Sequence, residues 1–106
     1  MAKYLFEGRY NADGIKGVLK DGGTGRKAAV EAALKGLGGR IEAMYYAFGD
    51  TDVYVIVDIP DNVTAAAVAM GISASGAVGV KTTVLLSVDE IDQAGKKTMS
   101  YRATGH

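Results

Sequence analysis

The sequence predicts an α+β fold of the ferredoxin-like type, in which a four-stranded antiparallel sheet with the order βαββαβ carries both helices on one face. Three observations support this prediction. Residues 53–59 are the most apolar and β-branched run of the chain, which is typical of a strand in the middle of a sheet. The turn-forming residues 49–52 join this run to a preceding strand-like segment. Two stretches with helical spacing of apolar residues separate the remaining strands.

The first half of the chain predicts two strands and one main helix. Residues 3–10 alternate in character, as a half-buried strand does. Residues 15–20 predict a short helical turn, and the glycine-rich residues 21–25 predict a flexible loop. We expect Thr24 to cap a helix over residues 26–37, because apolar residues there share one stripe: Val30, Ala33, Leu34 and Leu37. Gly38 and Gly39 end this helix, and residues 40–48 form the second strand.

The second half predicts two strands and two helices. Pro60 ends the strand over residues 53–59, and Asp61 caps a helix over residues 63–75. The expected buried stripe of that helix is Val63, Ala66, Ala67 and Met70. Residues 78–86 form the fourth strand, and a capping-box pattern at residues 87–90 opens a short helix to about residue 94. The sequence therefore predicts one domain over residues 1–95 and a C-terminal tail over residues 96–106, with the first and third strands in the centre of the sheet.

Composition narrows the class of partner. Twelve basic residues balance twelve acidic ones in a chain of 106, so no global field favours nucleic acid or an anionic membrane. The chain has no cysteine, which fits a reducing compartment, and its first residues lack the pattern of a signal peptide. No apolar run approaches the ~20 residues of a membrane helix. We expect a cytoplasmic protein that binds neither nucleic acid nor a membrane.

The helix-free face of the predicted sheet is the feature that bears on assembly. Tyr54, Ile56 and Asp58 are expected there, because the alternate residues of their strand are more uniformly apolar and should meet the helices. Neighbouring strands are expected to add further residues to this face: Leu5, Glu7, Arg9, Met44, Tyr46, Phe48, Lys81, Thr83 and Leu85. Covering an apolar patch of several hundred Å² is worth roughly several kcal/mol. We therefore expect an isologous homodimer, or a higher oligomer that contains it.

Five residues of that face are the predicted ligand-binding set: Glu7, Arg9, Tyr46, Tyr54 and Asp58. Between two facing sheets they would line a partly polar cavity suited to a small organic molecule. The alternative is an ordinary dimer seam with paired charges. Asp58 is also the candidate general base, with Glu7 as the other choice, if burial raises its pKa.

Other site classes have less support. His106 is the only histidine, which excludes a catalytic triad and a metal site built on two histidines, and we expect no metal and no organic cofactor. Residues 21–27 are glycine-rich and carry two cations, so they suit either an anion site at a helix N-terminus or a plain capped loop. Four aspartates, Asp50, Asp52, Asp58 and Asp61, suit either a hard cation or turns and helix caps.

Several segments together resemble the GYD domain proteins, a bacterial family without an established activity that is placed among the dimeric α/β barrels. The segments are Tyr-Leu-Phe at residues 4–6, residues 38–49, Asp52, Pro60 and Asp61, residues 75–78, Thr82 and Thr83, and Glu90. The resemblance spans roughly residues 3–95 and implies the fold and the dimer. The family is named for a Gly-Tyr-Asp motif or a close variant, and here Thr51 stands at the tyrosine position.

Three functional hypotheses follow. The first is an oligomeric module that binds a small organic ligand between its sheets. The second is a cofactor-free enzyme, such as an isomerase or a monooxygenase, that uses a buried carboxylate; it rests on analogy with other dimeric α/β barrels. The third is a purely structural assembly protein.

Overall fold

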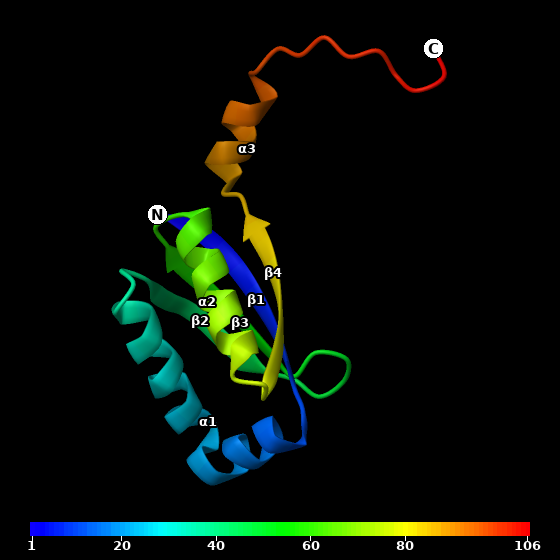
Figure 1. Cartoon of the computed structure of the whole chain (residues 1–106). Coiled ribbons are helices and arrows are strands. Elements are labelled where there is room, and N and C mark those ends of the chain that lie inside the picture. Colours follow the sequence, from blue (N-terminus) through cyan, green and yellow to red (C-terminus); the bar gives the residue numbers. More distant parts are fainter.

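A computed structural model describes residues 1–106 and confirms the predicted fold class (Figure 1). The strands are β1 (Ala2–Tyr10), β2 (Arg40–Tyr46), β3 (Val53–Ile59) and β4 (Val78–Leu85). The helices are α1 (Ala12–Lys35), α2 (Asn62–Ala74) and α3 (Val88–Gly95). The sheet order is β2-β3-β1-β4 and every neighbouring pair is antiparallel, so β1 and β3 occupy the centre as expected.

The core lies between one face of the sheet and the helices α1 and α2. The buried apolar side chains alternate along the two central strands and meet one stripe from each helix: Tyr4, Phe6, Val53, Val55, Val57, Ile59, Leu34, Ala65 and Val68. The Tyr4 hydroxyl donates a hydrogen bond of 2.5 Å to the Asn62 side-chain oxygen, which satisfies the one polar group that this core residue carries. Both helices therefore cover the same face, and the other face of the sheet has no helix on it.

The glycine-rich stretch bends a helix instead of forming a loop, so that prediction was wrong. Helix α1 begins directly after Asn11, whose side chain accepts a hydrogen bond from Gly14 N at 3.0 Å, and Thr24 is not its cap. Only Gly22 departs from helical geometry, with φ 72° and ψ 165°, a conformation open to glycine and strained for other residues. The bend redirects the second half of α1 along β2.

Helix α2 buries a different side from the one predicted. Ala65 and Val68 are buried and Ala69 and Ile72 are half-buried, whereas Val63 is 80 % exposed and Met70 72 % exposed. The helix carries no charged residue between Asn62 and Ala74, so no polar side marks which apolar side faces the core. In α1 the predicted stripe is confirmed at Val30 and Leu34, while Ala33 and Leu37 are exposed.

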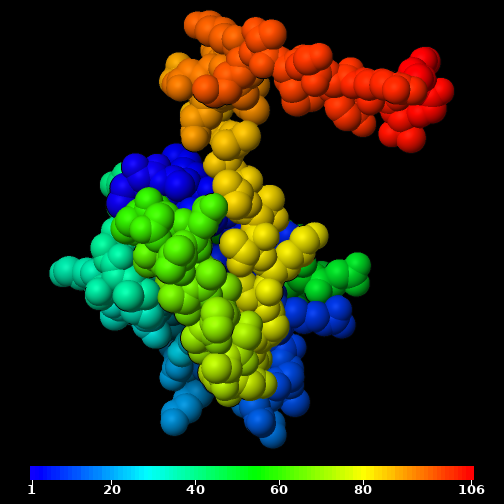
Figure 2. All heavy atoms as spheres, turned by 45° about the horizontal axis from the view of Figure 1, so that its top comes forward, coloured from blue at the N-terminus to red at the C-terminus, as the bar shows by residue number.

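Helix α3 and the residues after it project from the end of the sheet (Figures 1 and 2). The predicted capping box is present: Ser87 Oγ accepts from Glu90 N at 3.0 Å, and Glu90 Oε1 accepts from Ser87 N at 2.9 Å. No residue of α3 is buried, so the packed part of the chain ends with β4. None of the three helices has the combination of length and apolar character that crossing a membrane requires.

Two leucines of α1 form a matched test of this packing. Leu34 is 1 % exposed and Leu19 is 80 % exposed. Leu34→Ala should lower the free energy of unfolding by about 2–5 kcal/mol, because it leaves a cavity under the helix. Leu19→Ala should change it by no more than about 0.5 kcal/mol. Urea unfolding followed by circular dichroism measures both, and equal midpoints for the two variants would contradict the described core.

Candidate functional site

The helix-free face of the sheet brings together most of the predicted site residues. Pairing of β1 with β3 sets Lys3 opposite Asp58, Leu5 opposite Ile56, and Glu7 opposite Tyr54. Because directly paired residues of an antiparallel ladder share a face, these six side chains form three rows across the centre of the sheet. Strand β4 extends the rows with Leu85, Thr83 and Lys81, and β2 extends them with Arg40, Ala43 and Tyr45.

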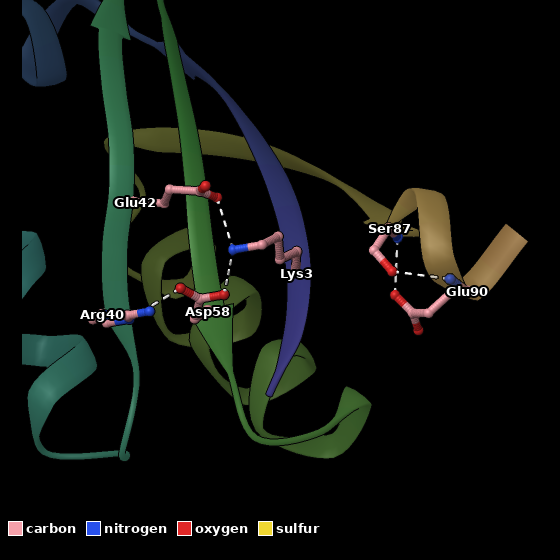
Figure 3. A network of polar contacts seen from close by, with 6 residues as sticks. All are labelled: Lys3, Arg40, Glu42, Asp58, Ser87 and Glu90. Carbon is pink, nitrogen blue, oxygen red and sulfur yellow. Dashed lines mark hydrogen bonds and ion pairs between the residues drawn. The ribbon is translucent and has the colours of Figure 1, made fainter.

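One end of this face is a closed network of four charges around Asp58 (Figure 3). Asp58 is only 4 % exposed, and its two carboxylate oxygens accept hydrogen bonds from Lys3 Nζ at 2.8 Å and Arg40 Nε at 3.0 Å. Lys3 Nζ also donates to Glu42 Oε2 at 3.0 Å. Two cations thus neutralise two carboxylates, and every charge has a partner of opposite sign.

This network determines the protonation state of Asp58. The hydrogen bond from Lys3 lowers the pKa of Asp58, and the positive charges of Lys3 and Arg40 lower it further, in opposition to the effect of burial. The hydrogen bonds to Asp58 and Glu42 raise the pKa of Lys3 in turn. A general base at neutral pH would need a raised carboxyl pKa. The expectation that burial raises the pKa of Asp58 was therefore wrong, because two cations engage its carboxylate and lower that pKa, which does not favour a general base there.

A β-bulge in β2 completes the network. The pairing shifts by one residue between Ile41 and Ala43, so Arg40 and Ala43, three positions apart, both point away from the helices. Without the extra residue, Arg40 would point to the opposite face from Ala43 and away from Asp58. Sequence reasoning missed Arg40, because a bulge leaves no signal in the alternation of a short strand.

Tyr46 does not join the other predicted residues. It lies directly opposite Val53, a core residue, and therefore points to the helix side of the sheet. Its hydroxyl donates to the Gly23 carbonyl of α1 at 3.2 Å. Met44 likewise lies on the helix side, opposite Val55, and Phe48 lies in the fully exposed loop after β2. The predicted placement of these three residues on the helix-free face was wrong, because the register of β2 sets Met44 and Tyr46 opposite core residues of β3 and β2 ends before Phe48.

The polar side chains at the other end of the face form no ion pairs and only long hydrogen bonds. Neither Glu7 nor Arg9 forms an ion pair within the chain. The Thr51 hydroxyl donates to Glu7 Oε1, and the Arg9 guanidinium donates to the Asp50 carbonyl oxygen. In both hydrogen bonds the donor–acceptor distance is 3.5 Å, which is long for a hydrogen bond. Tyr54 lies beside Glu7 in the register, and Lys81 lies beside it on the other flank. Sequence reasoning had placed Lys81 on this face and had left Thr51 as a turn residue.

The middle of the face is apolar. Leu5, Ala43 and Ile56 lie between the two polar ends, and Leu85 lies beside Lys3 on β4; all four are half-buried. The rings of Tyr45 and Tyr54 stand beside them and are exposed. The helix-free face therefore consists of a neutral ion-pair network, an apolar strip, and a polar end that carries Glu7, Arg9, Tyr54 and Lys81.

The aspartate cluster and the glycine-rich stretch have structural roles. Asp52 accepts a hydrogen bond from Tyr10 N at 2.8 Å, and Asp61 accepts one from Thr64 N at 2.8 Å as the cap of α2. No group of three or more histidine, aspartate or glutamate side chains comes close enough to hold a metal ion. Residues 21–27 lie within α1 at the kink where Gly22 joins its two helical halves, and Asp21 pairs with Arg26 there at 3.6 Å.

Comparison with known proteins adds one finding. The family model described as GYD domain matches residues 4–94 of the 106-residue chain. No curated protein and no solved structure matches the chain.

The Asp58 network predicts a specific pH dependence of stability. Because the folded-state pKa of Asp58 is lowered, the native state binds fewer protons than the unfolded state near that pKa. The stabilisation is therefore present above the ordinary aspartate pKa of about 4 and is lost as the pH falls through the lowered value. Asp58→Asn should lower the free energy of unfolding by about 1–3 kcal/mol at neutral pH. It should also reduce the fall of that free energy at acid pH, called the acid limb of the pH profile. Urea titrations at several pH values measure it.

Asp92→Asn, in the exposed helix α3, provides the control and should keep the wild-type pH profile. An acid limb for Asp58→Asn that runs parallel to the wild-type limb would contradict the described network.

Proposed function

The chain belongs to the GYD domain family, and from that premise we propose that it is a homodimeric binding protein whose copies pack their helix-free faces together around a small organic ligand. The observation that carries the proposal is the arrangement of that face, where an apolar strip runs beside the uncommitted polar groups Glu7, Arg9 and Tyr54. A pocket of this kind combines apolar lining with a few polar groups that fix orientation.

The exposed surface of the single chain supports a partner. A folded monomer of this mass is expected to expose roughly 5,600 Å². The chain exposes 7442 Å² at a mass of 11.0 kDa. Its radius of gyration of 16.8 Å also exceeds the roughly 13 Å expected for a compact domain of this length. Helix α3 and the residues after it project from the sheet and contribute to this excess, and a second copy is the simplest cover for the apolar strip on the sheet.

The charge balance of the face supports the same partner. Charges at a buried seam must be paired, because an unpaired ion is costly to remove from water. The four charges around Asp58 already pair within one chain, so a facing copy could cover them without supplying counter-charges. Glu7 and Arg9 have no such partners, which leaves them available for a ligand or for the second copy.

Ile56 lies at the centre of the apolar strip and tests the dimer. Ile56→Lys should give a monomer, because it sets two buried ammonium groups close to the symmetry axis. Val63→Lys adds the same charge on the exposed side of α2 and should leave the dimer intact. Light scattering coupled to size exclusion measures the mass. A wild-type monomer, or an Ile56→Lys protein that remains dimeric, would contradict the proposed seam.

Arg9 tests the ligand. In a thermal-shift screen of small polar organic compounds, at least one compound should raise the melting temperature of the wild type by mass action. The same compound should lose most of that shift with Arg9→Gln and keep it with Lys97→Gln, a control in the exposed C-terminal residues. An Arg9→Gln protein that is stabilised as strongly as the wild type would place the site elsewhere. If no compound in a broad screen raises the melting temperature, the result would favour a structural assembly protein without a ligand.

A further inference from the structure

An apolar hollow lies on the helix side of the sheet. Helices α1 and α2 lie on the same face of the sheet (Figure 1). The hollow lies between them and the sheet, lined by residues of both helices and of the strands. Val30 and Leu34 of α1 form one wall, and Val68 and Ile72 of α2 form the other. Eleven of the thirteen lining residues are hydrophobic, and the hollow has a volume of about 80 Å³.

A further space lies between α1 and α2 and is lined by residues of these two helices alone. This adjoining space of about 110 Å³ shares the same four wall residues. The two spaces are together of the same order as an engineered apolar cavity of about 150 Å³ that takes up benzene. Protein interiors are normally packed without such voids, because wall atoms lose contacts across a gap. An apolar group of ring size would restore those contacts.

Arg26 is the one charged residue among those lining the hollow. The bend at Gly22 directs the part of α1 that carries Arg26 along the sheet. The guanidinium of Arg26 forms one long ion pair, in which its nitrogen lies 3.6 Å from a carboxylate oxygen of Asp21. Arg26 also borders the wider outer space of about 350 Å³ at the open end, together with Tyr10. It therefore lies where the apolar hollow meets solvent.

Two phenols accompany this guanidinium. Burial raises the pKa of Tyr10 and of Tyr46, and the positive charge of Arg26 opposes the rise in both, so the two rings lie close to Arg26. Tyr10 borders both the hollow and the outer space and keeps its proton at neutral pH, so its hydroxyl is a hydrogen-bond donor there, whereas the Tyr46 hydroxyl already donates to the Gly23 carbonyl. A planar guanidinium with a neighbouring hydroxyl donor matches the oxygens of a carboxylate. Asp13 borders the outer space as well and would repel a second carboxylate there.

We propose that the hollow between α1, α2 and the sheet binds a small aromatic or short-chain monocarboxylic acid, whose apolar part fills the hollow and whose carboxylate pairs with Arg26. This site lies on the opposite side of the sheet from Glu7, Arg9 and Tyr54. It is independent of the dimer and of the ligand proposed for the helix-free face.

Benzoate and its neutral counterpart benzamide test the site. In a titration of the ¹⁵N-labelled full chain at millimolar concentrations, benzoate should shift the backbone amides of the wall residues Val30, Leu34, Val68 and Ile72. Benzamide should bind about tenfold more weakly, because it lacks the charge-assisted pair with Arg26. Absence of shifts with benzoate, or shifts centred on Glu7 and Tyr54, would overturn the proposal.

Matched variants distinguish the effect of the Arg26 charge on binding from the effect of the shape of the hollow. Arg26→Gln should weaken benzoate about tenfold and leave benzamide unchanged, whereas Lys27→Gln, the neighbouring cation, should leave both unchanged. Val68→Phe should fill the hollow and abolish binding of both compounds. If Val68→Phe does not give the spectrum of a folded protein, the comparison of Arg26→Gln with Lys27→Gln decides alone. Equal benzoate affinity in those two variants would overturn the proposal.

Discussion

The ladder between β1 and β3 is the constraint on which the rest of the molecule depends. Its register sets Tyr4 opposite Val57 and Phe6 opposite Val55 on the helix side, and Leu5 opposite Ile56 on the other side. Because side chains alternate with a period of two, a slip of one residue would turn the whole core outward and bring the charged residues inward. The burial of alternate residues on both central strands therefore specifies one register, and that register creates the two different faces.

The two faces are incomplete in different ways. On the helix-free side the polar groups around Asp58 are satisfied, and an apolar strip remains exposed. On the helix side the bend of α1 at Gly22 brings Arg26 over a gap that α1 and α2 do not close. The exposed apolar strip suits a large, flat, self-complementary partner, and the gap beside Arg26 suits a small molecule with one charge. One chain thus carries two separate proposed binding surfaces, one for a second copy and one for a small acid.

Much of the fold was predictable from local signals, and the errors share a cause. Strand β3, the capping box at Ser87 and the cap at Asp61 each depend on a few adjacent residues, and the structure confirms them. The face of α2 was not predictable, because alanine and valine surround that helix on every side. The face of Tyr46 follows from its register with Val53, and the position of Arg40 follows from the bulge of β2; both depend on pairing between strands, which a short segment of sequence does not specify. The hollow beside Arg26 depends on how two helices lie on the sheet, which no local pattern encodes.

The central claim is that a second copy covers the helix-free face. Isotope-filtered nuclear Overhauser spectroscopy on an equimolar mixture of ¹³C-labelled and unlabelled chains tests it most directly, because only contacts between copies give signals. We expect cross-peaks between copies that join the methyl groups of Leu5, Ile56 and Leu85. A spectrum in which these methyls show contacts only within their own chain, at concentrations where the mixture has exchanged, would contradict the claim.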